Sequence, residues 1–342
     1  MLEGSNRIGG RVKSVKFGGK PVEEGANRVI GKEGTRLWDV VQKYKVSGKK
    51  TDYDSVLIRN FRGLTGTEGE NAWTKLEAAQ MTVSEIYKRI EDKKTEDMSA
   101  RTSLDIGRWS PVEKVVEIFD YDFEYGGSPG VTSCYSFGIP EESANDLYYI
   151  MDKSGIGVQK SGSVTFNPPL PDCKNDNLFR VRLENYVSVY FKFPNTSSRF
   201  WDNTKYILYA DDRRGLFPVW QNLEVDGLFS PGTNILQMVT QGEDADRVSE
   251  LTDADITGEV MAILRRVYTN VVDPEDVFIT NWKSNPLYMG SFCNMDTLAF
   301  KPVIFEAIRA PVGNVFFAGD SKLLIGSLPV IQRGLRGAES TL

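Results

Sequence analysis

The sequence has 342 residues, a length typical of about two domains. Its 40% hydrophobic and 26% charged residues are those of an ordinary globular protein with enough apolar material for a sizeable core. No run approaches the roughly 18 consecutive apolar residues of a membrane-spanning helix, which excludes an integral membrane protein. The net charge of −6 disfavours non-specific nucleic-acid binding and is compatible with a cationic ligand.

The chain contains no histidine, which excludes Ser-His-Asp and Cys-His catalysis and any imidazole metal site. Its three cysteines, Cys134, Cys173 and Cys293, are far apart in sequence and form no Cys-x-x-Cys pair. We therefore expect no metal site and no disulfide framework, and interpret the cysteines as small buried hydrophobic residues. The chemistry must come from carboxylates, tyrosines, lysines or a bound organic cofactor.

The first 31 residues alternate short β-like runs with pairs of glycines. Gly18-Gly19 before Lys20-Pro21 predicts a hairpin or loop. Earlier in this segment, Glu3 is followed by Gly9-Gly10 and Arg11. An acidic residue that ends a strand commonly binds the ribose of a dinucleotide, paired glycines allow close backbone approach, and an arginine can pair with a pyrophosphate.

Three later segments have the pattern of helices. Residues 34–94 are polar and mostly helical in pattern, with apolar residues at roughly helical spacing over Asn71–Lys93. Ser110–Glu113 combines an N-cap serine, a proline at the first helical position and a capping-box glutamate, which predicts the start of a helix. Glu243–Asn270 is again helical in pattern.

The middle of the chain is rich in β-forming residues. Four such runs, with turn residues between them, predict an antiparallel meander, because no connection of helix length separates them: Val187–Phe193, Lys205–Ala210, Leu216–Leu223 and Ile235–Gln241. Asp211–Gly215 is a good hairpin loop. Near the end of the sequence, Gly313–Asp320 predicts a short apolar strand that closes on Gly-Asp.

One glycine motif resembles a nucleotide-binding turn only superficially. Ser154–Lys160 contains Gly-x-Gly after the apolar run Leu147–Met151. Lys160 occupies the third glycine position, and the serine- and proline-rich residues that follow offer no helix N-terminus to a phosphate. We interpret this segment as a flexible turn.

The ordered motifs of the chain together resemble the flavin-containing amine oxidases, and the polyamine oxidase branch most closely. They cover most of the sequence and are Leu2-Glu3, Ile8–Arg11, Val22–Asn27, Phe119–Phe123, Val131–Ser133, Phe166–Pro171, Tyr186–Pro194, Phe200-Trp201, Tyr209-Ala210, Arg213–Gly215, Val219–Gln221, Trp282–Phe292 and Ala310–Asp320. The resemblance implies an α/β + α+β fold, in which an incomplete FAD-binding, Rossmann-like domain joins a substrate domain containing an antiparallel sheet. The expected division is a partial FAD-binding domain at 1–35 and 275–342 and a substrate-binding domain at 36–274, helical over 70–125, with the sheet at 186–242 and a helix at 252–270.

The resemblance also implies a chemistry and a set of site residues. In this family FAD takes a hydride from a carbon next to an amine nitrogen, oxygen reoxidises the cofactor, and the resulting imine hydrolyses. The residues that would hold FAD are Glu3, Gly9, Gly10, Arg11, Gly25, Ala26, Asn27, Trp282, Gly290, Gly319 and Asp320. Tyr186 and Phe292 would be aromatic residues of the substrate tunnel, although core packing is an equally good interpretation of both, and Asp122 is a candidate substrate carboxylate.

The sequence departs from the family pattern at several points. The strand and Gly-x-Gly-x-x-Gly turn expected before Leu2-Glu3 are not in this chain, and a long stretch expected after Tyr149 is shortened. Ser188 stands at the position of the lysine that would hold a water against the flavin; a hydroxyl can hold a water but supplies no positive charge. Pro329 stands where a flavin-capping tyrosine is expected, and Asp320 replaces a glutamate.

These observations leave three hypotheses. The chain is an FAD-dependent oxidase of a polyamine or another amine, or a catalytically inactive, truncated homologue that binds polyamine or a protein partner, or a fragment without function. We expect a small-molecule amine partner, no nucleic acid and no membrane span. The sequence determines neither the amine nor the oligomeric state. The compartment is unknown: it is cytoplasmic by default, but a secretory leader could be missing with the N-terminus.

Overall fold

The computed structural model describes most of the chain. The described residues are 5–25, 29–30, 36–46, 48–104, 109–137, 147–149, 165–195, 199–225, 229–295, 304, 307–308, 310–315 and 317. The strands are β1 (Ser14–Phe17), β2 (Lys20–Glu23), β3 (Val29–Ile30), β4 (Val56–Asn60), β5 (Gly63–Leu64), β6 (Leu147–Tyr149), β7 (Val181–Glu184), β8 (Tyr186–Lys192), β9 (Tyr206–Tyr209), β10 (Val219–Asn222), β11 (Ile235–Gln241), β12 (Asp276–Ile279) and β13 (Phe292–Met295).

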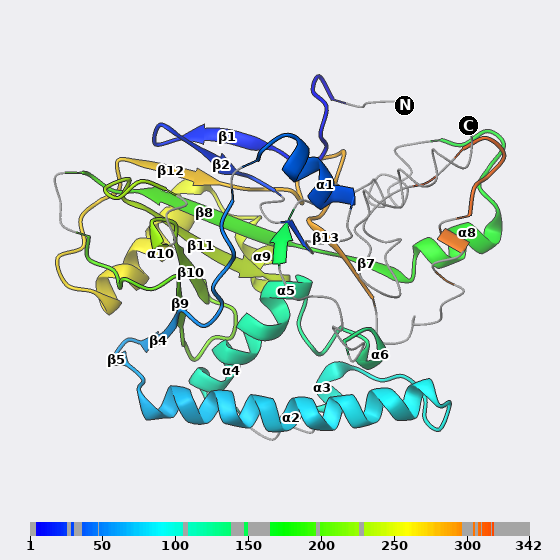
Figure 1. Ribbon diagram of the computed structural model, residues 1–342, viewed down its shortest axis with the longest axis horizontal. Coiled ribbons are helices and arrows are strands. Elements are labelled where there is room, and N and C mark those ends of the chain that lie inside the picture. Colours follow the sequence, from blue (N-terminus) through cyan, green and yellow to red (C-terminus); the bar gives the residue numbers. More distant parts are fainter. Residues whose placement is uncertain are drawn as a thin grey trace.

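The helices lie mainly on two sides of the largest sheet (Figure 1). They are α1 (Arg36–Lys43), α2 (Thr67–Glu91), α3 (Ala100–Ser103), α4 (Pro111–Glu117), a π-helical turn (Ile118–Asp122), α5 (Phe123–Tyr125), α6 (Cys134–Phe137), α8 (Asp172–Leu178), α9 (Gly242–Val248) and α10 (Asp253–Val267). The predicted helix over Glu243–Asn270 is therefore two helices. They divide where Thr252 caps the N-terminus of α10 by accepting a hydrogen bond from the Asp255 amide.

A seven-stranded sheet organises the molecule, with strand order β12-β8-β11-β10-β9-β4-β5. Strands β9, β10 and β11 form the predicted antiparallel meander, but β8 pairs with β11 rather than with its sequence neighbour β9. The expectation that residues 34–94 are mostly helical is wrong at β4 and β5. The apolar run Val56-Leu57-Ile58 instead pairs in parallel with β9 and extends the sheet.

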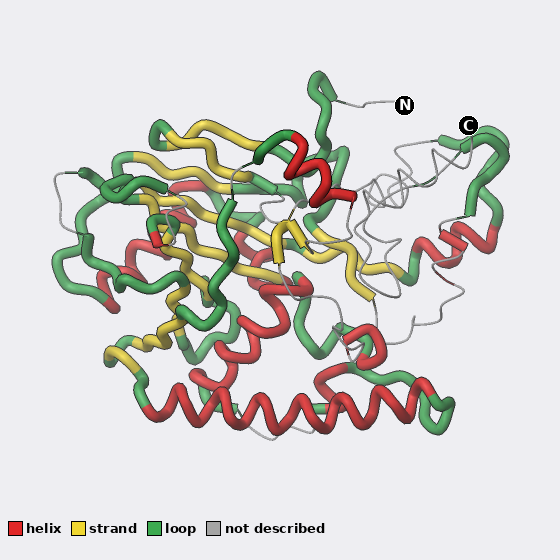
Figure 2. Tube along the Cα trace, in the orientation of Figure 1, coloured by secondary structure: helices red, strands yellow, loops and turns green. Residues whose placement is uncertain are grey.

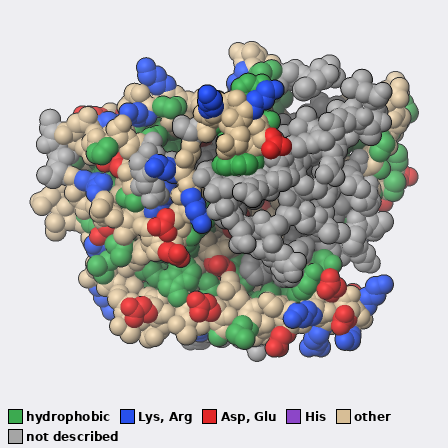
Figure 3. Space-filling view, viewed as in Figure 1, with side chains coloured by type: hydrophobic (Ala, Val, Ile, Leu, Met, Phe, Trp, Pro, Cys, Tyr) green, Lys and Arg blue, Asp and Glu red, His purple; other side chains and the backbone are tan. Residues whose placement is uncertain are grey.

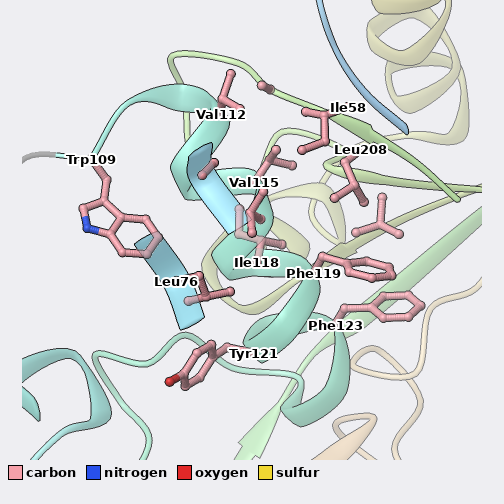
Figure 4. Packing of buried hydrophobic residues seen from close by; sticks show 14 of the residues in the cluster. Ile58, Leu76, Trp109, Val112, Val115, Ile118, Phe119, Tyr121, Phe123 and Leu208 are labelled. Atoms are coloured by element: carbon pink, nitrogen blue, oxygen red, sulfur yellow. The ribbon is translucent and has the colours of Figure 1, made fainter. Parts of the chain in front are cut away.

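The two faces of this sheet are covered by different helices. On one face, Val187, Val189 and Phe191 of β8 pack with the buried side of α10. On the other face, α4, the π-helical turn and α5 pack against β9 and β10, with Ile118, Phe119 and Phe123 among the buried side chains (Figure 4). Side chains alternate between faces along a strand, so Tyr186, Ser188 and Tyr190 lie on this second face.

The long helix α2 packs on the outer side of α4 and forms the lower edge of the view in Figure 1. Figure 2 shows α2, α3 and α4 together on this side of the sheet strands. The predicted start of α4 is confirmed: the Ser110 side chain accepts a hydrogen bond from the Glu113 amide at 3.3 Å, and the Glu113 carboxylate accepts one from the Ser110 amide at 2.7 Å.

The N-terminal segment forms the hairpin predicted at Gly18-Gly19, in which β1 pairs with β2. Phe17 and Val22 of the hairpin pack with Tyr190 and Ile235 of the seven-stranded sheet. The hairpin therefore lies over the second face of the sheet, beyond the end covered by α4 and α5. This contact brings the glycine-rich N-terminal segment to β8.

Other sequence expectations have mixed outcomes. Cys134 is buried as expected, but Cys173 is exposed on the short helix α8 and is not a core residue. The domain boundary at residue 275 stays a prediction, although β12 begins one residue later and pairs with β8 of the central sheet. Among the described residues, no helix combines the length and apolar character needed to cross a membrane. The expected turn at Ser154–Lys160 lies outside the described residues.

We predict that Ser110→Ala lowers the free energy of unfolding by about 1 kcal/mol, because the first turn of α4 loses its capping hydroxyl. Thr74→Ala is the matched control, since the Thr74 hydroxyl bonds only to the carbonyl of Glu70 within the exposed side of α2. Urea unfolding of the two variants measures the difference. Equal midpoints for both variants would contradict the structural importance of the cap.

Candidate cofactor and amine site

Segments that are distant in sequence meet where β8 begins. The Arg11 guanidinium donates from Nη1 to the backbone carbonyls of Gly290 at 3.2 Å and Ser291 at 2.6 Å. The Ser291 amide donates to the carbonyl of Glu184 at 2.9 Å, and the Tyr186 amide donates to the Ser291 hydroxyl at 3.2 Å. The N-terminal segment, the 288–291 turn and β8 are thus joined by buried hydrogen bonds.

Trp282 extends this junction to the end of β2. Its indole N–H donates to the carbonyl of Glu24 at 3.1 Å, and its ring packs edge-on against Tyr288 at 5.2 Å. The Arg11 guanidinium lies 5.9 Å from the centre of the Tyr288 ring. Arg11, Trp282 and Tyr288 are all buried.

Three glycines have physical reasons to be glycine. Gly9 and Gly10 both have positive φ, in a turn closed by a hydrogen bond from the Val12 amide to the Gly9 carbonyl. At Gly25 the requirement is space, because a Cβ atom would lie 1.8 Å from the carbonyl oxygen of Arg11. Only glycine, which has no Cβ, permits the backbone at position 25 to approach Arg11 this closely.

Of the predicted cofactor residues, the structure therefore brings Arg11, Gly25, Trp282 and Gly290 together, with Gly9 and Gly10 in the turn before Arg11. The other predicted cofactor residues lie outside the described part of the chain; they are Glu3, Ala26, Asn27, Gly319 and Asp320. The junction supplies a buried guanidinium, an indole and a backbone without Cβ. These groups fit a planar cofactor that carries phosphates. Their individual roles stay predictions.

The predicted substrate-side residues lie along β8. Tyr186 is half-buried, and its ring centre is 6.1 Å from that of Phe123. Phe123 in turn packs edge-on against Tyr206 of β9. Tyr186 thus ends a row of aromatic rings that crosses the second face of the sheet. The backbone of Phe292 pairs with Glu184 as β13 runs beside β7, while its side chain lies outside the described residues.

Ser188, at the position of the expected lysine, is buried and makes polar contacts to both neighbouring strands. Its hydroxyl accepts a hydrogen bond from Nε2 of Gln237 on β11 at 3.1 Å. Its backbone amide donates to the Thr280 hydroxyl at 2.8 Å, at the end of β12. Sequence reasoning missed Gln237 and Thr280, although a glutamine inside an apolar strand is a signal that could have marked the first.

Asp122 lies in a buried cluster of charges. Its two carboxylate oxygens each accept a hydrogen bond at 2.7 Å from Arg214, which also donates to Glu117 at 2.8 Å. Arg101 pairs with Glu117 from the other side. Burial by itself would lower the pKa of Arg214, but Asp122 and Glu117 more than offset this and raise it.

The pairing with Arg214 neutralises Asp122, so its role as a substrate carboxylate stays a prediction that this geometry does not favour. Sequence reasoning missed the pairing of Arg214 with Asp122 and Glu117, because these partners are far away in the chain. The π-helical turn that ends at Asp122 places this carboxylate toward Arg214 while Phe119 and Phe123 stack on each other at 5.5 Å.

Glu184, the last residue of β7, is a buried carboxylate beside the site. Burial raises the pKa of Glu184, and the neighbouring Arg182, which donates to its carboxylate at 2.9 Å, offsets only part of this effect. The ionised form of Glu184 therefore costs stability in the folded protein.

Comparison with known proteins assigns the chain to a family. Residues 1–120 and 154–329 match the family described as flavin containing amine oxidoreductase. Similar curated proteins include polyamine oxidase 1 of Zea mays, 24% identical over 94% of this chain and 80% of its own length, and polyamine oxidase 7 of Oryza sativa subsp. japonica, 26% identical over 94% and 84%.

Solved structures of amine oxidases share the fold. Putrescine oxidase bound to putrescine has a TM-score of 0.70 and 13% identity, over 99% of this chain and 92% of its own. Cyclohexylamine oxidase from Brevibacterium oxydans has a TM-score of 0.69 and 16% identity, over 99% and 92%.

The chain therefore belongs to the flavin-containing amine oxidoreductases, a family of FAD-dependent enzymes. The predicted family is confirmed, and with it the fold class of an FAD-binding part joined to a substrate part with an antiparallel sheet. The expectation of FAD as the cofactor and of an oxidoreductase is confirmed at the level of the family.

We predict that Gly25→Ala destabilises the protein by about 1–3 kcal/mol, because its Cβ would collide with backbone rather than with a flexible side chain. Gly258→Ala is the matched control. Gly258 is exposed on α10, and no neighbouring side chain or element lies within 4 Å of the place that an added Cβ would take, so this variant gains about 0.5–1 kcal/mol. Thermal unfolding compares the two, and a Gly25→Ala protein as stable as wild type would contradict the close approach.

We predict that wild type loses stability relative to Glu184→Gln as pH rises. The pKa of Glu184 in the folded protein lies above its ordinary value of 4.5. Protonation of Glu184 therefore stabilises the folded protein fully below pH 4.5, and this stabilisation is lost as the pH rises through the raised pKa. Urea unfolding at about pH 4 and about pH 8 measures this change. A difference between the two proteins that does not vary with pH would show that the carboxylate is not destabilised by burial.

Proposed function

We propose that this chain is an FAD-dependent polyamine oxidase, which oxidises a carbon–nitrogen bond of a polyamine with oxygen as the final acceptor. One observation carries the proposal: the plant polyamine oxidases align over 94% of the chain. The residues of the candidate site, Arg11, Gly25, Tyr186 and Trp282 among them, lie within the segments 1–120 and 154–329 that match the family. FAD, when bound, supplies the two-electron acceptor for this chemistry.

The chain's own residues would hold and align the amine. Tyr186 and the aromatic rings behind it offer an apolar wall that limits water at the reacting carbon. Ser188 adds a neutral hydroxyl two residues further along the same strand face. An uncharged wall of this kind favours the neutral amine, the form that can lose a hydride from the carbon next to nitrogen.

Acidic groups outside this wall would attract a polycation. The chain carries a net charge of −6, and on the face seen in Figure 3 acidic side chains lie beside the apolar surface between the sheet and the long helix. Carboxylates near an apolar recess raise the local concentration of a cationic ligand and thereby its association rate. The positively charged ends of a polyamine fit this arrangement.

The test is an anaerobic titration of the FAD-loaded protein. After gel filtration we expect a retained flavin spectrum, which spermidine bleaches and which air restores. Benzylamine, a monoamine, is the control and should bleach the flavin more slowly. Loss of all flavin on gel filtration would reject an oxidase and favour the inactive homologue. A retained flavin that spermidine does not bleach would reject the polyamine as substrate, and equal bleaching by both amines would reject selectivity for polyamines.

A further inference from the structure

Two aromatic donors hold consecutive peptide groups immediately before Gly25. The Tyr190 hydroxyl donates to the carbonyl of Glu23 at 2.9 Å, and the Trp282 indole donates to the carbonyl of Glu24 at 3.1 Å. Tyr190 of β8 and Trp282 therefore hold this segment from two different parts of the chain. The Glu24 amide completes the set by donating to the carbonyl of Lys13 at 2.8 Å.

The position of the Tyr190 ring is set by packing. Tyr190 is 3% exposed, stacks on Phe278 of β12 at 5.9 Å and lies 6.4 Å from Phe17 of the hairpin. A phenylalanine would make the same ring contacts. The hydroxyl is the one part of Tyr190 that packing does not require, and it is used to hold the segment that leads to Gly25.

The phenol stays protonated and is thus a permanent donor. Burial raises the pKa of Tyr190 further above its ordinary value of 10.0, the Glu23 carboxylate adds to this, and a hydrogen bond from Ser188 offsets part of it. Ser188 accepts in turn from Gln237. The Glu23 carbonyl can only accept, so the Tyr190 hydroxyl is the donor in their hydrogen bond.

This arrangement determines the direction of the Gly25 amide. In a trans peptide the N–H points opposite to the C=O of the same group. With the Glu24 carbonyl held by Trp282, the Gly25 N–H points away from the indole. Within the described residues it forms no hydrogen bond.

We propose that Tyr190 is a positioning residue for the cofactor site: with Trp282 it fixes the Glu23 and Glu24 carbonyls and so aims the Gly25 N–H at an oxygen or nitrogen acceptor of the bound flavin nucleotide. The inference rests on the proposed function, because it requires that the chain binds FAD. It adds a role for a hydroxyl that the packing of the sheet does not need.

The experiment compares two buried tyrosines of the same sheet, each changed to phenylalanine. In Tyr190→Phe the Glu23 carbonyl loses its donor. In the control, Tyr209→Phe, the lost hydroxyl donates to Asp211 at 2.8 Å on the opposite face of the sheet. We expect similar small losses in the unfolding midpoint of the two proteins without FAD, because each loses one buried hydrogen bond. The FAD dissociation constant, from quenching of flavin fluorescence, rises about tenfold in Tyr190→Phe only.

A second variant and a spectrum complete the test. Trp282→Phe removes the other donor and keeps a ring against Tyr288, so it too should weaken FAD binding and should shift the visible band of the bound flavin as Tyr190→Phe does. A Tyr190→Phe protein that binds FAD as wild type does, with an unchanged spectrum, would overturn this inference alone. If wild type itself binds no FAD, the proposed function fails and the inference falls with it.

Discussion

The pairing of β8 with β11 on one side and β12 on the other is the interaction on which the rest of the molecule depends. One face of β8 is apolar and packs against helix α10, and this packing places the strand in the core. Since side chains alternate along a strand, this also fixes Tyr186, Ser188 and Tyr190 on the opposite face. Three hydrogen bonds then connect the candidate site to β8. The Ser291 hydroxyl accepts from the backbone amide of Tyr186, and the Thr280 hydroxyl accepts from that of Ser188. The N-terminal segment accepts from the Tyr190 hydroxyl.

Two guanidinium groups in the interior are held by groups of the protein itself. Arg214 joins Asp122 and Glu117 between the π-helical turn and the loop after β9, and Arg11 donates to carbonyls of the 290–291 turn. A buried ion pair adds little net stability, but the loss of one partner leaves a costly unpaired charge. Such pairs specify which elements pack together. They also leave the wall formed by Tyr186 and Ser188 without formal charge, in agreement with a site for a neutral amine.

Local patterns in the sequence predicted local structure well. The hairpin at Gly18-Gly19 and the capping box at Ser110 each depend on residues within four positions, and both are found in the structure. The missed features join distant residues. Strand β4 finds its partner in β9, some 150 residues later, and Arg214 meets Asp122 through the packing of a helix on a sheet. Candidate cofactor residues could be proposed from motif order, but the contacts of Tyr190 and Gln237 could not, because neither contact is encoded in a local pattern.

Ser188 stands where the family resemblance predicts a lysine, and its surroundings are suited to a serine. Gln237 donates its carboxamide N–H to the Ser188 hydroxyl, and both side chains are buried. A lysine ammonium at this position could only donate, so the carboxamide of Gln237 would have to turn and present its oxygen instead. It would also bring a charge into a place where no carboxylate contacts Ser188 among the described residues, at a considerable desolvation cost. Ser188 and Gln237 therefore form one neutral unit whose hydrogen bonding does not change over the physiological pH range. If the chain oxidises amines, any dependence of the reaction on pH must come from the substrate or from groups beyond this pair.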